Sequence, residues 1–362
     1  MFDMLKASRA RVSARAHAIA ARALCVAVVL AATLANAASG HANAYTAPRG
    51  KVLVGVAGGR SADGYVRAVG KRPAVFQFFV EWGERFGWAY RRAAQAHAGL
   101  MVHLSTYNGP GTKERITPRA IAIGRDDRYL VTLGRDFAAH GRPAYLRLFS
   151  EMNNAANPYS AFHHNGAARD ESHSPAWFRQ AWRRAALILK GGPVATIDAR
   201  LRALGLPALR GDARGPRLPR PRIALQWAPM TAGSPAVAGN GPDAYWPGAA
   251  YVDWVGTDFY ARFPNFHGLD RFYADPRYAG KPFVFGEWAL WGRDEPSFVR
   301  RFFAWVAAHR RVRMLAYNQG NRPSSEFRLY RYPRAARAIR SALRSPLYTG
   351  RPLVTSNAAP RL

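Results

Sequence analysis

Two glutamates are the residues best placed for chemistry in this sequence. Glu151 stands in RLFSEMNNAANPYS, residues 147–160, where an apolar run passes into a polar loop, and Glu287 stands in FVFGEW, residues 283–288. A carboxylate at the end of a buried strand needs a partner or a task. Two facing carboxyl groups suit the hydrolysis of a glycosidic bond, because one can protonate the leaving oxygen while the other, ionised, attacks the anomeric carbon. Like charges push the two pKa values apart, so identical residues can divide these roles.

The elements that must position this pair are eight short, apolar, β-rich runs. They are Val52–Ala57, Ala74–Val80, Leu100–Ser105, Ala144–Phe149, Ile223–Ala228, Tyr251–Asp258, Phe283–Gly286 and Met314–Tyr317. Between them, apolar residues recur at three- and four-residue spacing, as in residues 178–189 and 298–306, which predicts helices. Strands that alternate with helices predict a parallel sheet. Eight such units in roughly 310 residues fit one α/β domain, a closed (β/α)8 barrel of the TIM type.

The barrel explains how two residues far apart in the sequence can meet. Active sites of this fold lie at the carboxyl ends of the strands. The fourth predicted strand ends at Glu151, just after its apolar run, and the seventh ends at Glu287, just after its own, so we expect the two carboxyl groups to face each other across the barrel mouth.

The first residues of the chain have the composition of a secretory signal peptide. Basic residues from Lys6 to Arg22 precede an apolar run at 23–35, and small residues offer cleavage after Ala37 or Ala44. The run is too short to span a bilayer. We therefore predict a signal peptide over residues 1–37 and a secreted, extracellular protein; an uncleaved membrane anchor is the alternative interpretation.

One segment interrupts the alternation of strands and helices. Residues 193–222 contain a short helical pattern at Ile197–Leu206 and a loop rich in Pro, Gly and Arg at Arg210–Arg222. We interpret the segment as an insertion in a single catalytic domain over residues 45–350. The sequence has neither a metal-ligand cluster nor a phosphate-binding glycine loop, so we expect no metal and no cofactor.

The charge of the chain is strongly positive. The formal net charge is +31, with 47 Arg and 6 Lys that are scattered along the sequence. Scattered arginines and export argue against a nucleic-acid partner, whereas a cationic surface favours association with an anionic cell envelope or an acidic polysaccharide. The one cysteine, Cys25, lies in the predicted signal peptide, so no disulfide is expected in the mature chain. The sequence makes no prediction of oligomeric state.

Three segments together resemble glycoside hydrolase family 26. They are SEMNNAANPYS at 150–160, YWPGAAYVDWVGTDFY at 245–260 and FGEW at 285–288. The family adopts a (β/α)8 barrel and mostly hydrolyses β-1,4-mannans, with some members acting on mixed-linkage glucans or xylans. The resemblance implies that Glu151 is the acid/base and Glu287 the nucleophile of a retaining mechanism. It also implies that Tyr260 donates a hydrogen bond to the nucleophile.

The sequence departs from the family pattern beside the acid. Ser150 stands where the family usually has His, and Asn153-Asn154-Ala155-Ala156 replaces Asn-Gly-Xaa-Trp. The missing Trp weakens the expectation that mannan is the polysaccharide substrate. Two alternatives stay open: a catalytically impaired barrel that binds glycans at the cell envelope, and a basic scaffold that adheres to anionic polymers.

Aromatic residues near the strand ends are candidate substrate-binding residues. Sugar rings stack on aromatic faces through their C–H groups, so Trp227, Trp246 and Trp288 are candidate platforms; ordinary core packing is the alternative for each. Trp82 and His103 are weaker candidates.

Three polar residues complete the list of candidates. Arg147 shares the parity of Glu151 on its strand, so it should point into the barrel either as a cation that tunes the site or as the partner of another barrel acid. Asn153 and Tyr317 either bind substrate hydroxyls or close their own loops.

Overall fold

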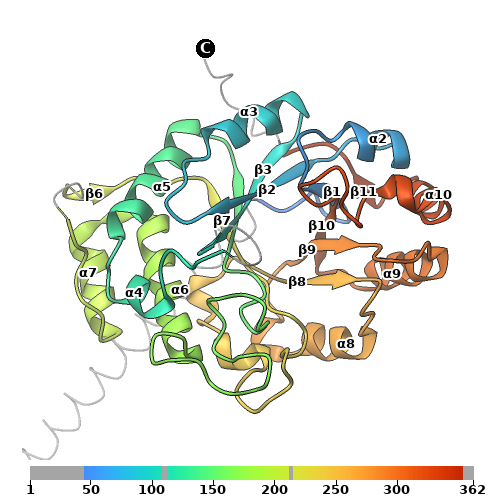
Figure 1. Ribbon diagram of the computed structural model, residues 1–362. Helices are drawn as coiled ribbons and strands as arrows, with labels where there is room; N and C mark the ends of the chain where they lie inside the picture. The colour runs from blue at the N-terminus through green and yellow to red at the C-terminus, as the bar shows by residue number, and fades with distance from the viewer. Residues whose placement is uncertain (1–44, 108–111, 212–214, 354–362) are drawn as a thin grey trace, which may run out of the picture. The chain divides into compact units, whose positions relative to one another are not determined.

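The structure of the protein is a computed structural model that describes residues 45–107, 112–211 and 215–353 (Figure 1). The predicted signal peptide at residues 1–37 and both candidate cleavage sites lie outside the described residues.

Eight parallel strands close into a barrel. They are β1 (Val52–Ala57), β2 (Val75–Glu81), β3 (Gly99–Ser105), β4 (Ala144–Leu148), β7 (Ile223–Trp227), β8 (Trp254–Tyr260), β9 (Phe283–Ala289) and β10 (Val312–Asn318). Each pairs in parallel with the next, and β10 pairs with β1, which closes the ring. A short strand, β11 (Tyr348–Thr349), pairs in parallel with the amino end of β1. The predicted (β/α)8 barrel is therefore confirmed, and each of the eight predicted runs overlaps a barrel strand.

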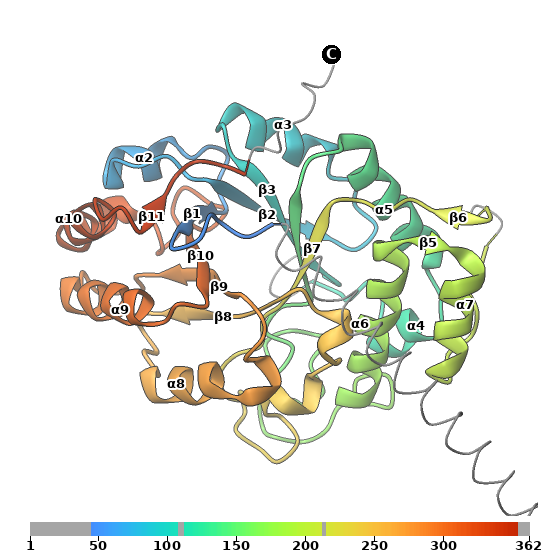
Figure 2. The same cartoon turned by 180° about the vertical axis from the view of Figure 1, so that it is seen from behind.

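Helices surround the strands in both views of the molecule (Figures 1 and 2). They are α2 (Asp63–Val69), α3 (Gly87–Gln95), α4 (Pro118–Ala122), α5 (Asp127–His140), α6 (Pro175–Lys190), α7 (Val194–Ala203), α8 (Phe266–Ala274), α9 (Pro296–Ala308) and α10 (Pro333–Ala342). Local sequence sets where α6 begins: the Ser174 side chain accepts a hydrogen bond from the Trp177 N–H, and Pro175 occupies the first turn. Among the described residues, no helix combines the length and the apolar character needed to cross a membrane.

The segment predicted as an insertion forms a small substructure after α6. Strands β5 (Gly192–Pro193) and β6 (Arg217–Leu218) pair antiparallel, and α7 lies between them in sequence. Helix α7 begins at Val194 and ends at Ala203, so it starts and ends three residues before the predicted helix. In Figures 1 and 2 it lies beside α6, on the outside of the barrel.

Two apolar cores follow from the alternation of side chains along each strand. The smaller core takes side chains from all eight strands: Leu53, Val75, Met101, Tyr145, Ala224, Trp254, Val284 and Met314. The larger core lies between the strands and the helices and contains the neighbouring residues of alternate parity. This parity decides which strand residues can reach the barrel mouth, because only those in step with the smaller core point inward.

Candidate active site

A β-bulge turns Glu287 into the barrel. On β9, Val284 belongs to the inner core, so strict alternation would aim Gly286 inward and Glu287 outward. The pairing of β8 with β9 shifts register here, and Asp258 lies opposite Glu287 instead of Gly286. Bulges re-aim side chains in this way next to active sites. Glu287 therefore points inward at the carboxyl end of the strand, and Trp288 points outward.

Both oxygens of the Glu287 carboxyl group are held by hydrogen bonds. Oε2 accepts from the Tyr260 hydroxyl at 2.8 Å and from Asn318 Nδ2 at 2.7 Å. Oε1 accepts from the Arg147 guanidinium at 2.8 Å and from Gln77 Nε2 at 3.4 Å. The residue is only 6% exposed, so these contacts fix the orientation of the carboxyl group in a nearly dry environment.

This environment favours the ionised form of Glu287. Burial opposes ionisation, but His103, the positive charge of Arg147 and the Tyr260 hydroxyl outweigh it and lower the pKa of Glu287 to about 2. The Nδ1 atom of His103 lies 3.5 Å from Oε1 and is not aligned for a hydrogen bond, so we attribute the shift chiefly to Arg147 and Tyr260. At neutral pH the group is a carboxylate.

Arg147 is a fully buried cation that joins two acids. Its guanidinium donates to both oxygens of Asp258, at 2.6 and 2.7 Å, as well as to Glu287. The predicted pairing of Arg147 with another barrel acid is therefore confirmed by Asp258, and its contact with Glu287 is the one that a cation tuning the site would make. Gly286 leaves the space for it, because a Cβ atom at that position would lie 2.3 Å from the guanidinium carbon.

Glu151 sits just beyond the end of β4 on an unusual backbone. Phe149 has φ 47° and Glu151 has φ 54°, in the left-handed region that non-glycine residues avoid. Hydrogen bonds hold this conformation: the Glu151 N–H donates to the Ala228 carbonyl at 2.8 Å, and Asn157 Nδ2 donates to the Glu151 carbonyl at 2.8 Å. Strain that is held in place in this way is typical of functional sites.

The carboxyl group of Glu151 has the opposite electrostatic character to that of Glu287. Burial and the negative charge of Glu287 raise the pKa of Glu151, and among the described residues its one side-chain donor is Asn154 Nδ2, at 3.0 Å from Oε2. Glu151 follows the carboxyl end of β4 and Glu287 lies near the carboxyl end of β9, so the parallel barrel places the two carboxyl groups at the same mouth. One acid is held ionised, and the other is pushed toward its protonated form.

Two of the predicted aromatic platforms are core residues. Trp227 is fully buried and packs against Trp246 and Tyr278, and Trp288 is 2% exposed and stacks on Phe302 of α9. Both rings point toward the helix layer, because each residue follows an inward-pointing neighbour on its strand. The prediction that they bind substrate is therefore wrong, and the alternative of core packing holds.

Asn153 also has a structural role. Its side chain is fully buried, donates to the Met230 carbonyl at 3.0 Å and accepts from the Met230 N–H at 2.8 Å. It ties the loop after β4 to the loop after β7 and has no polar atom left to face a substrate. Tyr317 is buried as well and donates to the Phe327 carbonyl, which closes its own loop. Trp246 is half-buried, with its ring against Trp227 and Tyr278.

Several residues at the site were not predicted from the sequence, or were predicted only as weaker candidates. Gln77, Asp258 and Asn318 all contact Glu287 or Arg147. Each shares the inward parity of its strand, which is the signal that could have found it. His103, treated as a weaker candidate, lies opposite Arg147 in the sheet, next to the half-exposed ring of Phe79.

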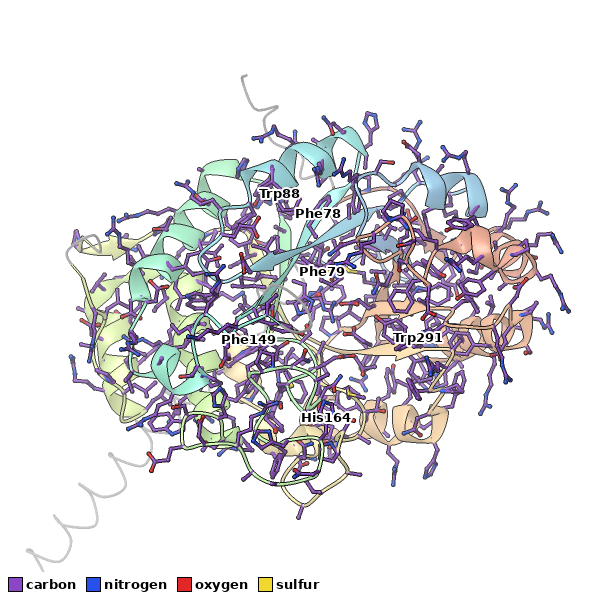
Figure 3. The ribbon with its side chains drawn as sticks, viewed as in Figure 1. Phe78, Phe79, Trp88, Phe149, His164 and Trp291 are labelled. Carbon is purple, nitrogen blue, oxygen red and sulfur yellow. The ribbon has the colours of Figure 1, made fainter. Side chains whose placement is uncertain are left out.

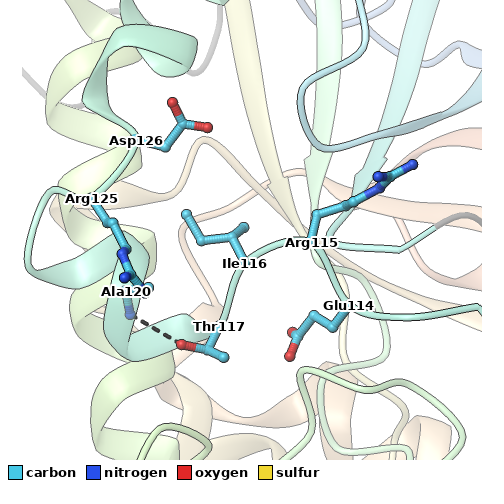
Figure 4. Close-up of a pocket in the computed structure, with 7 residues that line it drawn as sticks. All are labelled: Glu114, Arg115, Ile116, Thr117, Ala120, Arg125 and Asp126. Atoms are coloured by element: carbon cyan, nitrogen blue, oxygen red, sulfur yellow. Dashed lines mark hydrogen bonds between the residues drawn. The ribbon is translucent and has the colours of Figure 1, made fainter.

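A pocket of about 310 Å³ lies apart from this pair, on the loop between β3 and α4 and the start of α5 (Figure 4). Its charged groups are mostly engaged: Glu114 with Thr106 and His173, Arg115 with Glu81, and Asp126 with the Trp82 indole. These contacts stabilise the loops. In the described part of the chain, no group of three or more His, Cys, Asp and Glu is arranged to hold a metal ion.

The comparison with known proteins rests on structure. The sequence matches no protein-family model. It matches none of the curated proteins either. Solved structures do match. One is a modular endo-β-1,4-mannanase from Cellulomonas fimi, described with the glycoside hydrolase family 26 mannanases. It is 17% identical with a TM-score of 0.54, and the match covers 83% of this chain and 72% of the mannanase chain. Mannanase man26 from Bacillus subtilis is 16% identical with a TM-score of 0.52, over 87% of this chain and 91% of its own. The YdhT protein of the same organism is 17% identical with a TM-score of 0.51, over 84% and 88%. The chain therefore has the fold of glycoside hydrolase family 26, as the motifs predicted.

Proposed function

We propose that the protein is a secreted glycoside hydrolase that cleaves β-linked polysaccharide with retention of configuration. The observation that carries the proposal is the electrostatic division between two carboxyl groups at one barrel mouth: Glu287 has its pKa lowered to about 2, and Glu151 has its pKa raised. An acid and a carboxylate in this relation are the two groups that glycoside hydrolysis needs.

In the first step, Glu151 protonates the leaving oxygen while Glu287 attacks the anomeric carbon. The bond between that carbon and the leaving oxygen breaks, and a covalent glycosyl ester forms on Glu287. The carboxylate suits this role because hydrogen bonds hold both of its oxygens and little water reaches it. A general base that activates water would need water beside its carboxyl group, so the buried Glu287 fits the role of nucleophile better.

In the second step, Glu151 acts as the base. Having lost its proton, it takes one from a water molecule that attacks the anomeric carbon and releases Glu287. Bond formation at Glu287 removes its negative charge, so the pKa of Glu151 falls when the proton must leave and rises again when the ester is hydrolysed. No step needs a cofactor.

The substrate class follows from the structural neighbours at a coarse level. The mannanases that share this fold are named for mannan, and the name of the Cellulomonas fimi enzyme specifies the β-1,4 linkage; a polysaccharide with a β-linked backbone is the corresponding substrate class here. The replacement of the family His by Ser150 supports a substrate or an acid strength that differs from theirs, since the Ser150 hydroxyl is buried without a hydrogen-bond partner among the described residues.

The proposal is tested by release of reducing ends from a panel of mannan, mixed-linkage glucan, xylan and an envelope polysaccharide. The mature protein should release reducing ends from at least one polymer. Glu287→Ala should reduce the rate by about 10³-fold or more, and Glu151→Gln by about 10²- to 10⁴-fold, with the fold unchanged by circular dichroism. Azide should restore turnover in Glu287→Ala, because a small anion can occupy the space of the carboxylate and attack the same carbon.

The competing function is a barrel that binds glycan without cleaving it. Linkage-selective binding with no reducing ends from any polymer would favour that function. Full activity in either variant would remove the residue concerned from the mechanism.

A further inference from the structure

A group of aromatic side chains lies beside the nucleophile's hydrogen-bond partner and has no part in the mechanism above. Trp291, in the loop after β9, packs edge to face on Tyr260, with ring centroids 5.8 Å apart, and Tyr260 donates to Glu287. The Trp291 indole N–H donates to Glu326 at 2.6 Å, which fixes the ring. Figure 3 labels Trp291 beside strands β8 and β9. Because Tyr260 contacts both residues, Trp291 lies close to Glu287 at the barrel mouth.

Two residues of the loop after β8 complete the group. Phe263 packs edge to face on Trp291 with centroids 5.7 Å apart, and it is 65% exposed, one of the most exposed large apolar side chains in the described part of the chain. Arg262 lies over both rings, with its guanidinium carbon 5.0 Å from the centroid of Trp291 and 5.7 Å from that of Phe263. An exposed aromatic ring with a cation held on its neighbour is a surface for a sugar ring that carries negative charge.

The Arg262 guanidinium is available for such a ligand. Within the described ranges, no carboxylate lies within 4 Å of it, and no hydrogen-bond acceptor is recorded for it. Glu326, an acid of the loop after β10, is engaged by the Trp291 indole. An arginine held against aromatic rings loses little freedom when its N–H fork binds a carboxylate.

The charge around this group agrees with an anionic ligand. Loops after β1, β8, β9 and β10, which are neighbours in the barrel, each carry an exposed arginine: Arg60, Arg262, Arg293 and Arg322. Of the acids on the same loops, Asp294 accepts from two backbone N–H groups at the start of α10, which occupies both of its oxygens. On the other side of the mouth, Glu81 ends β2, and the loops after β2, β3 and β4 carry the acids Glu84, Glu114 and Asp170.

We propose that Trp291, Phe263 and Arg262 form a subsite that selects a sugar unit bearing a carboxylate, so that the preferred substrate is an acidic β-linked glycan. The inference rests on the proposed function for the location of the cleaved bond, but binding at the subsite does not require turnover. Phe263 supplies the stacking face, and Arg262 supplies the charge that separates a uronate from a neutral sugar of the same stereochemistry. Trp291 holds the two in place next to Tyr260.

Binding of matched oligosaccharides tests the proposal. One pair is β-1,4-mannohexaose and β-1,4-linked hexamannuronate, which differ only in the carboxylate at C6; the second pair is cellohexaose and the β-1,4-linked hexamer of glucuronate. Calorimetric titration of the mature Glu151→Gln protein measures affinity without hydrolysis. In at least one pair the acidic hexamer should bind about tenfold tighter than the neutral one, and the difference should shrink in about 0.5 M salt.

Arg301→Ala is the matched control for Arg262→Ala. Arg301 is also exposed and also lies over an aromatic ring, 4.1 Å from the centroid of Phe266, but it belongs to the outer helix α9. The two variants change the net charge equally. Arg262→Ala should weaken binding of the acidic hexamer about tenfold and of the neutral one by less than about threefold, and Arg301→Ala should change neither.

Three outcomes would overturn the proposal: equal affinity within both pairs, tighter binding of the neutral hexamers, or equal losses in the two arginine variants, which would indicate attraction by net charge alone. The result is independent of the hydrolysis assay. Binding that depends on Arg262 without cleavage of any polymer would leave the subsite in place and remove the proposed hydrolysis. Cleavage of neutral polymers alone, with equal binding of acidic and neutral hexamers, would support the proposed hydrolysis and remove the acidic subsite.

Discussion

Replacement of Arg147 by methionine tests the electrostatic basis of the site. The side chain is fully buried and donates to Gln77, to Glu287 and to both oxygens of Asp258. Methionine fills much of the same volume without charge. The variant therefore leaves two buried carboxyl groups without their cation.

The cost in stability depends on pH. Breaking a buried ion pair by removal of one partner costs about 3–5 kcal/mol at neutral pH. In the native protein, the pKa of Glu287 lies at about 2 against an ordinary value of 4.5, so its ionisation stabilises the fold by about 3 kcal/mol. That contribution is present above pH 4.5 and is lost as pH falls through 2. Without Arg147, burial raises the pKa of Glu287, and acid then stabilises the variant relative to the native protein.

Urea unfolding of both proteins at several pH values between about 7 and 4 measures this difference in the free energy of unfolding. We expect a deficit of about 3–5 kcal/mol at neutral pH that shrinks by more than about 1 kcal/mol at the acid end. The turnover rate of the folded variant should fall by about 10²-fold or more, because the nucleophile is no longer held ionised.

Arg184→Met is the control. Arg184 is equally buried and forms two hydrogen bonds with Asp127, at 2.7 and 2.5 Å, away from the barrel mouth. Its loss should lower stability by a similar amount but leave the turnover rate of folded molecules unchanged. Native turnover in Arg147→Met, or a deficit in stability that does not vary with pH, would refute the role assigned to Arg147.

Two further predictions concern single hydrogen bonds. Tyr260→Phe removes the 2.8 Å donor to Glu287, and loss of this donor raises the pKa of the carboxyl group. The value of kcat should therefore fall about 10- to 100-fold, and the acid limb of the pH–rate profile should move to higher pH. An acid limb at the native pH would contradict the assignment. His173 bridges Glu114 and Asp170, and although burial opposes it, these hydrogen bonds raise its pKa above 6.5. Its contribution is complete below pH 6.5 and is lost as pH rises through the raised value, so His173→Gln should destabilise the fold more at about pH 6 than at about pH 8.5 in thermal unfolding.

The barrel could be predicted from the sequence because each strand is buried on both faces. Continuous apolar runs, separated by helical periodicity, mark such strands clearly. The boundaries were less certain where apolar residues continue beyond the strand. The run Tyr251–Asp258 begins three residues early because a short 3₁₀ turn at Ala249–Tyr251 precedes β8, and aromatic residues fit either conformation.

The site could be predicted only in part, because side-chain direction on a barrel strand depends on parity. Trp227 and Trp288 each lie one residue from an inward-pointing side chain, so their rings face the helices: Trp227 follows Gln226, which lies opposite Arg147, and Trp288 follows Glu287. Counting residues along the strand does not reveal the bulge at Gly286. A register shift depends on the neighbouring strands, and no local pattern reports it.

The backbone anchors the two carboxyl groups in different ways. Glu287 belongs to a paired strand and is anchored through both oxygens, whereas Glu151 follows a kink at Phe149 and starts a long loop. A rearrangement of that loop would carry the acid toward or away from a fixed target without disturbing the sheet. Substitutions between Phe149 and Ser160 would therefore change the separation of the Glu151 and Glu287 carboxyl groups while the barrel strands stay as they are.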